Sequence, residues 1–588
     1  MASNVELSRM FYRMAEVMQL TGENAFKSIA FQKVARALED LDYDVVEAAR
    51  AGELAEIPGV GASSRRIIEQ YAKDGKSDDY ERLIALVPLG VLEMIKIPGL
   101  GPKTAAQLWT VLKLESVQEL ELAIKEGRIA GIKGLGEKKV AGILAGIELL
   151  KTGMKRRGYM VVLPIVTRFV DYLKQDVRVG GVQPAGSFRR RRETVGDLDI
   201  VCWVHNPEDA KAIIERFTSH PTNEKTLVAG GTKASILVAG GLQVDLRIVP
   251  KTSFGAAIQY FTGSKEHNVK LRGLALDRGM TLNEWGLYRL DEHEKAVKKT
   301  GEPPAVKSVA GENEASVYQA LGLPMIPPEL REDRGEIEAA LLNRLPALID
   351  VGDIRGDLHC HTSASDGNAT IEQMALAAKA LGYAYIAITD HSQSSVIANG
   401  LSEERLRAHI AAIRRTVVPG ITILAGSEVD ILPDGRLDYD AALLAELDIV
   451  IASPHASLKQ DADKANDRML RAIETRYVNI IGHPTGRMIN RREGLPLDMG
   501  KIVAAAAKSG TALEINAGWP RWDLCDTDAR RAADAGVKIS INSDSHSTNE
   551  LPTIEMGIWV GRRAWLTPQH VINCLSLQDL RLWLNKKR

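Results

Sequence analysis

The sequence predicts a multidomain α+β and α/β protein with a helical N-terminal region, a middle region with a mixed sheet and a C-terminal α/β barrel. Three observations predict this fold class. Apolar residues at helical spacing fill residues 1–155, short runs typical of strands appear after residue 155, and seven such runs alternate with helical segments after residue 350. A length of 588 residues suffices for several domains.

The composition is that of a folded protein in water. Apolar residues make up 45% and charged residues 26% of the chain, which excludes a largely disordered or collagen-like protein. The sequence has neither a long apolar span nor the pattern of a secretory signal. The four cysteines lie far apart without CxxC spacing, so we expect reduced thiols. These features predict a cytoplasmic protein that has no membrane partner.

The net charge is −1, but the charged residues are unevenly distributed along the chain. Residues 91–290 carry 30 Lys and Arg against 20 Asp and Glu, whereas the segments on either side are acidic overall. A basic segment suits binding to a phosphate backbone, but solvated lysine faces produce the same excess. Charge alone therefore leaves nucleic-acid binding open.

One glycine pattern recurs three times in the helical region. The copies IPGVG, IPGLG and IKGLG begin at Ile57, Ile97 and Ile132, and a helical segment follows each one. The glycines permit a tight turn, so that backbone N–H groups at the next helix N-terminus can face a phosphate oxygen. A single copy equally suits two helices that pack through glycines, but three copies favour a phosphate-binding function.

The repeat resembles the helix-hairpin-helix element, which binds the DNA backbone without reading base sequence. The resemblance implies DNA contacts from the turns and from one following lysine, namely Gly59, Gly61, Gly99, Gly101, Lys103, Gly134 and Gly136.

Paired aspartates mark the middle region. Its β-type runs are YMVVLPIV, LDIVCWV, ASILVAG and LQVDLRIV, which cover residues 159–166, 198–204, 234–240 and 242–249. Asp197 and Asp199 alternate along a strand and so project from one face, and Asp245 lies on what we expect to be a neighbouring strand. Three carboxylates suit Mg²⁺ or Mn²⁺, and a two-metal site supports in-line displacement at phosphorus. A DxD motif alone would equally suit an exposed polar strand face.

Gly186 and Ser187 precede this motif and favour a triphosphate site, with Arg190 supplying a bidentate charge. Together these residues resemble the nucleotidyltransferase signature. The segment YFTGSKEHNVKLR, residues 260–272, resembles the nucleotide-binding segment of family X DNA polymerases, and this resemblance covers residues 1 to 330 in order.

The resemblance implies roles by position. Asp197, Asp199 and Asp245 would be the metal-binding catalytic residues. The triphosphate would be held by Gly186, Ser187, Arg190 and Gly196. Tyr260, Phe261 and Gly263 would lie at the sugar, Asn268 at the minor-groove edge of the incoming nucleotide, and Arg272 at the template.

Two departures from the family accompany the resemblance. Lys265 stands where DNA polymerase beta has an acidic residue beside the incoming base. Ile67 stands where the 5'-deoxyribose-phosphate lyase has its Schiff-base lysine, and isoleucine cannot form an imine. Although Lys73 and Lys76 follow, we expect lyase activity to be absent or weak.

The last region is rich in histidine. Seven apolar runs, from DIRGDLHCHT to VKISINSDSH, each end in a metal-binding residue type, as at the C-terminal mouth of a βα barrel. Any one histidine could be an ordinary core residue. A set of six histidines and three carboxylates at these strand ends instead favours a metal site with mixed N and O donors. The nine are His359, His361, Asp366, His391, Glu428, His455, His483, Asp544 and His546. Cys360 alternates with its neighbours and is expected in the core.

This pattern resembles the polymerase and histidinol phosphatase (PHP) domain, a distorted (βα)7 barrel. The resemblance implies metal-dependent phosphoester hydrolysis with three divalent ions, Mn²⁺, Zn²⁺ or Fe²⁺. Asp357 and Asp390 are expected to orient neighbouring ligands rather than bind metal.

The order of modules resembles the bacterial and archaeal family X DNA polymerases. It implies a lyase-like helical domain over 1–85, fingers over 86–155, a palm over 156–250, a thumb over 251–325, a linker over 326–350 and a PHP domain over 351–588.

The resemblance implies DNA-directed gap filling in base excision repair, with Mg²⁺ or Mn²⁺ in the palm. The barrel would add 3'-5' exonuclease activity, and the resemblance leaves 3'-phosphatase and abasic-site endonuclease activity open as additions. The expected partners are gapped or primer-template DNA and deoxynucleoside triphosphates, and we expect a monomer at the nucleoid.

Two alternatives stay open at this point. In one, the palm is feeble and 3'-end processing is the main activity. In the other, the chain is a DNA-bound repair scaffold with degenerate metal sites, which retention of all the candidate ligands disfavours.

Overall fold

The computed structural model describes residues 2–587 except 24, 42, 55–56, 58, 96, 98–99, 130–131, 133–134, 152–155 and 297–303. The chain divides into two compact units. The first comprises residues 1–155 with 239–241, and the second comprises residues 156–238 with 242–588. Among the described residues, none of the helices has both the length and the apolar content needed to cross a bilayer.

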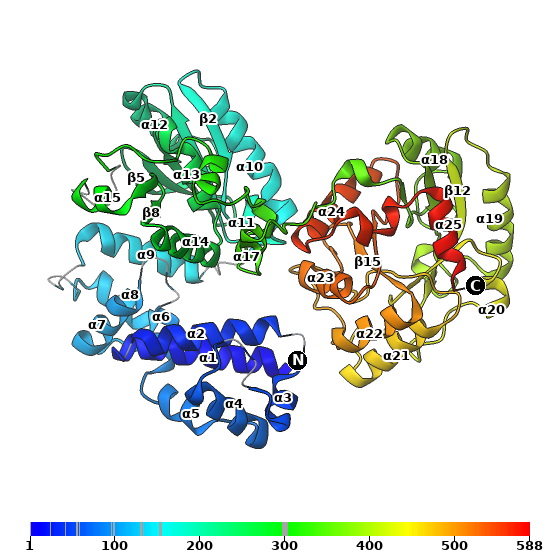
Figure 1. The fold of residues 1–588 in the computed structure, drawn as a ribbon, viewed down its shortest axis with the longest axis horizontal. Helices are drawn as coiled ribbons and strands as arrows, with labels where there is room; N and C mark the ends of the chain where they lie inside the picture. The colour runs from blue at the N-terminus through cyan, green and yellow to red at the C-terminus, as the bar shows by residue number, and fades with distance from the viewer. Residues whose placement is uncertain are drawn as a thin grey trace. The chain divides into compact units, whose positions relative to one another are not determined.

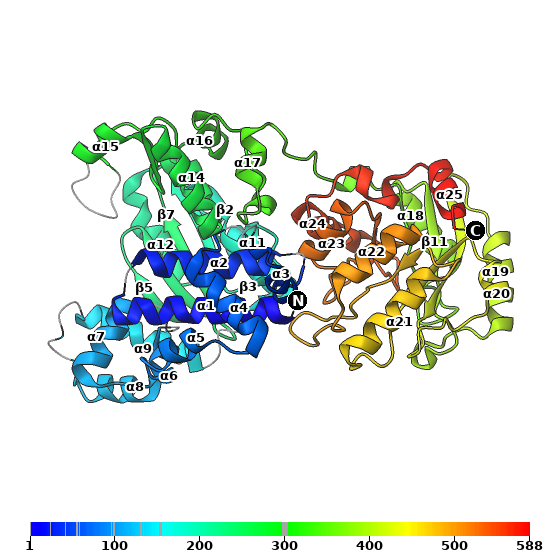
Figure 2. The same ribbon diagram turned by 60° about the horizontal axis from the view of Figure 1, so that its bottom comes forward.

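The first unit is helical throughout its described residues. Helices α1 and α2 run side by side (Figure 2), and the side chains of Phe11 and Phe31 meet edge to face at 5.3 Å between ring centroids. The helices are α1 (Ala2–Thr21), α2 (Ala25–Asp40), α3 (Val45–Ala51), α4 (Ala62–Asp74), α5 (Asp78–Ile84), α6 (Leu89–Met94), α7 (Pro102–Leu112), α8 (Val117–Lys125) and α9 (Glu137–Lys151). Each predicted glycine turn is followed by a helix, namely α4, α7 or α9, which confirms the helix-hairpin-helix pattern.

The second unit begins with a mixed five-stranded sheet, as predicted. Its strand order is β2 (Val179–Pro184), β4 (Asp197–Val204), β7 (Leu242–Ile248), β6 (Lys233–Val238) and β5 (Asn223–Ala229). Strands β4 and β7 are parallel and the other pairs are antiparallel. Helices α10 (Tyr159–Lys174) and α12 (Ala210–Thr218) pack against this sheet, and the short helix α11 (Gly186–Arg189) contacts β4. The short strands β1 (Arg157–Gly158) and β3 (Thr194–Val195) pair with each other.

One predicted strand is wrong. The run YMVVLPIV at residues 159–166 begins helix α10 instead. Its β-branched residues favour a strand, but Tyr159, Val162, Val166 and Phe169 are buried at three- to four-residue steps, which is the spacing of a helix face. The other three runs form β4, β6 and β7.

A smaller α+β region follows the mixed sheet. It contains α13 (Phe254–Thr262), α14 (Lys265–Asp277), the hairpin β8 (Met280–Asn283) and β9 (Gly286–Arg289), α15 (Leu290–Ala296), α16 (Glu314–Ala320) and α17 (Glu336–Leu341). Its apolar core includes Leu271 and Leu287 and also takes in Ile326, Leu330 and Ile337. Part of the expected 326–350 linker therefore packs into this core.

The C-terminal region is the predicted seven-stranded parallel barrel. The strands follow chain order: β10 (Gly356–Asp357), β11 (Tyr385–Ile388), β12 (Thr422–Asp430), β13 (Ile449–Ser453), β14 (Ile480–Ile481), β15 (Ala512–Asn516) and β16 (Ile539–Asn542). Cys360, just after β10, forms a parallel bridge with Ser545, just after β16, so the first and last strands meet.

Helices surround this sheet (Figure 1). They are α18 (Ile371–Ala380), α19 (Glu403–Arg415), α20 (Ala441–Leu444), α21 (Ala462–Glu474), α22 (Met499–Ser509), α23 (Asp526–Asp534), α24 (Ile554–Arg563) and α25 (Leu577–Asn585). The carboxyl ends of the seven strands therefore open on one mouth, where the predicted ligands gather.

Candidate functional site

Two neighbouring strands of the mixed sheet present the three predicted aspartates. Asp199 on β4 pairs in register with Asp245 on β7, and Asp197 lies two residues earlier on the same face. Leu198 points the other way and is fully buried. Gln243 donates from Nε2 to both carboxylate oxygens of Asp245, at 3.0 and 2.9 Å, which fixes the orientation of that side chain.

The electrostatics of this trio favour a bound cation. Burial and the charge of Asp197 raise the pKa of Asp199 to about 8. Burial and the charge of Asp245 also raise the pKa of Asp197. Carboxylates that repel one another in a buried site are stabilised by a divalent ion with oxygen ligands, so these residues fit a metal.

The predicted triphosphate residues lie beside the aspartates. Gly186 has a left-handed φ of 61°, and a Cβ at this position would lie only 2.6 Å from Oδ2 of Asp199. The buried hydroxyl of Ser187 has no hydrogen-bond partner among the described residues, so it is available to a ligand. Arg190 donates from Nη1 to the carbonyl oxygen of Thr262 at 2.5 Å and from Nε to Glu332 Oε1 at 3.0 Å.

The segment 260–263, after the third aspartate, also contacts this site. A Cβ on Gly263 would lie 3.1 Å from Nη1 of Arg190, so this glycine permits a close approach. Tyr260 and Phe261 contact each other edge to face at 5.2 Å. Phe261 also lines a small cavity together with Asp199 and Asp245.

Asn268 and Arg272 form a separate polar network. Asn268 accepts from Gln259 Nε2 and donates to the carbonyl oxygen of Tyr260, each at 2.7 Å. Arg272 donates from Nε to the carbonyl oxygen of Asn268 at 3.2 Å. These contacts hold Asn268 next to the Tyr260 backbone. Gly196 directly precedes Asp197, and a Cβ there would be 3.2 Å from Nη1 of Arg156.

The predicted DNA-binding turns lie in the first unit. Gly59 has a left-handed φ of 83°, and Gly61 and Gly101 are the N-cap residues of α4 and α7. Gly136 precedes α9, and both Gly136 and Lys103 are exposed. Gly99 and Gly134 lie outside the described residues.

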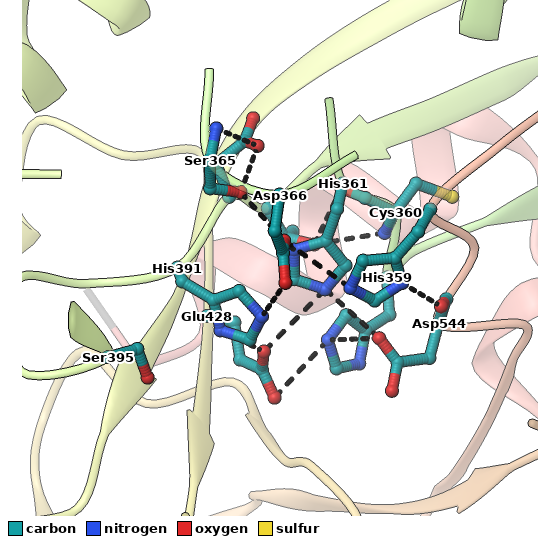
Figure 3. A network of polar contacts seen from close by, with 12 residues as sticks. His359, Cys360, His361, Ser365, Asp366, His391, Ser395, Glu428 and Asp544 are labelled. Atoms are coloured by element: carbon teal, nitrogen blue, oxygen red, sulfur yellow. Dashed lines mark hydrogen bonds and ion pairs between the residues drawn. The ribbon is translucent and has the colours of Figure 1, made fainter. Parts of the chain in front are cut away.

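The nine predicted ligands of the barrel converge at its mouth. Figure 3 shows His359, His361, His391, Glu428 and Asp544 directed toward one another. Potential ligand atoms group three ways: His361, Asp366, His391 and His546; His359, His361, Glu428 and Asp544; His391, Glu428 and His455. His483 joins them through Nε2, 2.9 Å from Glu428 Oε1. The core position expected for Cys360 is what the structure shows, since this thiol is fully buried in the apolar cluster.

Glu428 is the centre of this arrangement. Burial opposes its ionisation, but the charges of His455 and His359 hold its pKa well below the usual range. The ring atoms His359 Nε2, His361 Nδ1 and His483 Nδ1 are buried without a hydrogen-bond partner among the described residues. Buried imidazole nitrogens left unpaired around a carboxylate are costly unless a metal binds them, so this donor set fits divalent metals.

A relative from Bacillus subtilis (strain 168), named DNA polymerase/3'-5' exonuclease PolX, is 36% identical over 585 residues, which is 99% of each chain. The chain belongs to the PolX family. Matches to broader families agree with this assignment: helix-hairpin-helix domain over 2–77, SAM-like helix-hairpin-helix tandem over 91–148, DNA polymerase beta thumb over 257–332 and PHP domain over 357–517.

The barrel of this PolX chain also resembles shorter proteins. A probable phosphatase from Thermoanaerobacter sp. (strain X514) is 30% identical over 243 residues, 40% of this chain and 95% of that protein. A probable phosphatase from Shewanella sediminis is likewise 30% identical over 243 residues, 39% of this chain and 94% of that protein. The PHP barrel of this chain therefore corresponds to nearly the whole of such proteins.

Sequence reasoning missed several carboxylates that support the PolX barrel site. Glu514 on β15 contacts Nδ1 of His359 at 2.8 Å, and Asp430 contacts Nδ1 of His455 at 2.8 Å. Such contacts fix the tautomer and orientation of a ligating histidine. The signal was present, because each acid lies within an apolar strand run where a carboxylate needs a partner.

The two expected supporting aspartates lie close to the ligands. Asp357 accepts from the backbone N–H of His359 at 3.2 Å. Asp390 accepts from Thr362 and Ser365, which flank His361 and Asp366, and contacts His409 Nε2 at 2.8 Å. His409, which the sequence analysis did not select, therefore supports the site through Asp390.

Proposed function

We propose that this PolX polymerase/3'-5' exonuclease fills short DNA gaps during base excision repair, with separate centres for synthesis and for 3'-end hydrolysis. The observation that carries the proposal is the presence of two carboxylate-rich clusters within one chain. One lies on β4 and β7 of the mixed sheet, and the other lies at the mouth of the barrel.

The three sheet aspartates would hold Mg²⁺ or Mn²⁺. When bound, these ions supply charge neutralisation for the triphosphate and for the attacking primer hydroxyl. Asp197 and Asp199 face the incoming nucleotide, and Asp245, held by Gln243, is best placed to take up the proton of the primer 3'-hydroxyl. Gly186, the unpaired Ser187 hydroxyl and Arg190 bind the phosphate oxygens of a deoxynucleoside triphosphate.

The nine barrel residues would hold three divalent ions, Mn²⁺, Zn²⁺ or Fe²⁺. When bound, these ions supply Lewis-acid activation of a phosphodiester. Glu514 and Asp430 keep His359 and His455 oriented toward the centre. The same site would accept a terminal 3'-phosphate or an abasic-site ester, because each presents a phosphoester at an accessible DNA end or gap.

The N-terminal helical region would grip DNA without reading its sequence. Ile67, the residue at the expected lyase position, is 2% exposed in the core of the first unit, so it offers no nucleophile to a sugar phosphate. We infer absent or weak lyase activity, a cytoplasmic monomer located at the nucleoid, and gapped or primer-template DNA as the substrate.

A denaturing-gel assay of a 5'-labelled primer in gapped DNA with Mn²⁺ tests the two-centre proposal. Asp197→Ala/Asp199→Ala should abolish extension and leave primer shortening intact. His359→Ala/His361→Ala should abolish shortening and leave extension intact. A chain that extends equally well without the two aspartates would contradict the palm assignment, and dominant shortening with negligible extension in the wild type would favour the end-processing alternative.

A further inference from the structure

The last residue of helix α24 connects the barrel with the nucleotide site. Arg563 donates from Nη1 to the backbone carbonyl oxygen of Arg190 at 2.7 Å and to Glu332 Oε1 at 3.0 Å. Its Nη2 donates to Asp526 Oδ2, at the start of α23, at 2.7 Å. The side chain is only 2% exposed, so these contacts replace water entirely. If this arginine were removed, each of its acceptors would lose a buried hydrogen-bond donor that water cannot replace.

Glu332 is shared between the barrel and the predicted triphosphate arginine. The same Oε1 atom that accepts from Arg563 also accepts from Nε of Arg190 at 3.0 Å. Arg192 lies 3.6 Å from the other carboxylate oxygen. Three guanidinium groups therefore compete for one largely buried carboxylate, so Glu332 does not neutralise Arg190 by itself.

Arg190 is held in a way that leaves one end of its guanidinium group available. Nε is fixed by Glu332 and Nη1 by the carbonyl oxygen of Thr262. Nη2 has no hydrogen-bond partner among the described residues. Arg190 directly follows helix α11, whose first residue, Gly186, approaches Asp199 so closely that a Cβ there would lie 2.6 Å from Oδ2. Arg190 therefore belongs to the turn that lies against the metal-binding carboxylates, where the proposed triphosphate would bind.

We propose that Arg563 of the nuclease barrel is a positioning residue for Arg190, so that the barrel completes the nucleotide site of the palm. This inference rests on the proposed role of Arg190 in binding the triphosphate. Arg563 acts in two ways. It anchors the Arg190 backbone, and it shares the charge of Glu332, which would otherwise hold the Arg190 guanidinium group away from phosphate.

The test is Arg563→Met in the full chain, with steady-state gap filling measured against deoxynucleotide concentration. We expect the KM for the deoxynucleotide to rise about tenfold, the effect of losing one charge-assisted hydrogen bond, with little change in kcat. Exonuclease activity on a single-stranded oligonucleotide should be unchanged, because Arg563 contacts none of the barrel ligands. Arg563→Lys keeps the positive charge and places its donors on a single nitrogen, so the KM should lie between those of the wild type and Arg563→Met.

Arg562→Met is the matched control. Arg562 precedes Arg563 on the same helix and forms an equivalent contact, from Nε to Glu329 Oε1 at 2.8 Å, without touching Arg190 or Glu332. It should leave the KM for the deoxynucleotide unchanged. If both methionine variants raise the KM equally, the effect is general loosening of this junction and the positioning role is overturned.

The remaining outcomes separate this inference from the proposed function. An unchanged KM in a folded Arg563→Met chain, in which extension still depends on Asp197 and Asp199, overturns the positioning role alone. A wild-type chain that does not extend primers overturns both. If Arg563→Met does not fold, Arg563→Gln decides, because it removes the charge shared with Glu332, and a KM equal to that of the wild type would overturn the inference.

Discussion

At the scale of single residues, Glu314 shows how charge is buried without loss of stability. This carboxylate at the start of α16 accepts from Arg331 Nη1 at 2.5 Å and from Arg189 Nη2 at 2.7 Å. Burial opposes its ionisation, but the two guanidinium groups lower its pKa to about 2. Because Arg189 precedes the predicted triphosphate residue Arg190, the ion pair also fixes the loop that carries Arg190.

Glu314→Gln should therefore destabilise the chain in a pH-dependent way. A carboxyl pKa lowered on folding contributes stability that is complete above its unfolded value near 4.5 and is lost as pH falls toward about 2. The shift corresponds to about 3 kcal/mol. We expect the difference in melting temperature between wild type and variant to be largest above pH 5 and to shrink as pH is lowered toward 3.

The neighbouring exposed pair provides the control. Glu312 lies 3.5 Å from Lys251, and both side chains are more than half exposed, so Glu312→Gln should change the melting temperature little at any pH. A Glu314→Gln difference that stayed constant from pH 7 to pH 3 would contradict the assigned ionisation.

At the scale of secondary-structure elements, the turn from β2 into α11 sets the distance between the predicted triphosphate and metal groups. Gly186→Ala would place a Cβ 2.6 Å from Asp199 Oδ2 and would also strain a left-handed backbone. Either the turn or the carboxylate must move. We expect polymerisation to fall about a hundredfold, since a displacement near 1 Å can cost this much, with exonuclease activity retained in the same gel assay.

Gly279→Ala is the control that separates backbone strain from a steric clash with Asp199. Gly279 has a similar left-handed φ of 67°, but a Cβ there would meet nothing within 4 Å. Its polymerase activity should stay near that of the wild type. Equal losses in the two variants would mean that backbone strain, rather than the approach to Asp199, explains the defect.

Two kinds of feature were predictable from the sequence. One is a strand face marked by every second residue, and the other is an apolar strand that ends in a metal-binding residue type. The alternation of Asp197 and Asp199 correctly predicts one face of β4, and the seven apolar runs correctly predict the barrel strands. The run at 159–166 was not predictable in this way, because a short apolar run rich in valine suits a strand and a buried helix face equally. Only packing of Tyr159 and Val162 against the sheet decides in favour of α10.

Contacts between distant segments lay beyond sequence reasoning. Glu514 meets His359 across 155 residues, and Arg563 meets Arg190 across 373 residues. No local spacing encodes such pairs, because they depend on how the barrel closes and how it packs on the preceding region. Candidate ligands could be named from strand ends, whereas the carboxylates that orient them required the fold.

At the scale of the whole molecule, the two units have separate cores. The apolar cluster of the first unit runs from Leu7 to Ile147, and the clusters of the second unit begin at Tyr159. Within the part of the chain that the structure describes, the two sets of buried side chains do not overlap. Because each unit buries its own apolar surface, we expect residues 156–588 to fold without the first 155.

Removal of residues 1–155 therefore tests the helix-hairpin-helix assignment. The shortened chain should keep exonuclease activity on a single-stranded oligonucleotide, because all nine barrel ligands lie in the second unit. It should bind gapped DNA more weakly and with a shallower dependence of log K on log salt, since fewer phosphates are contacted.

In the full chain, Lys103→Ala should reduce that salt slope by about one if the exposed lysine contacts a phosphate. Equal affinity and equal slope with and without the first unit would mean that its glycine turns only pack helices together, and DNA binding would then belong to the palm and barrel.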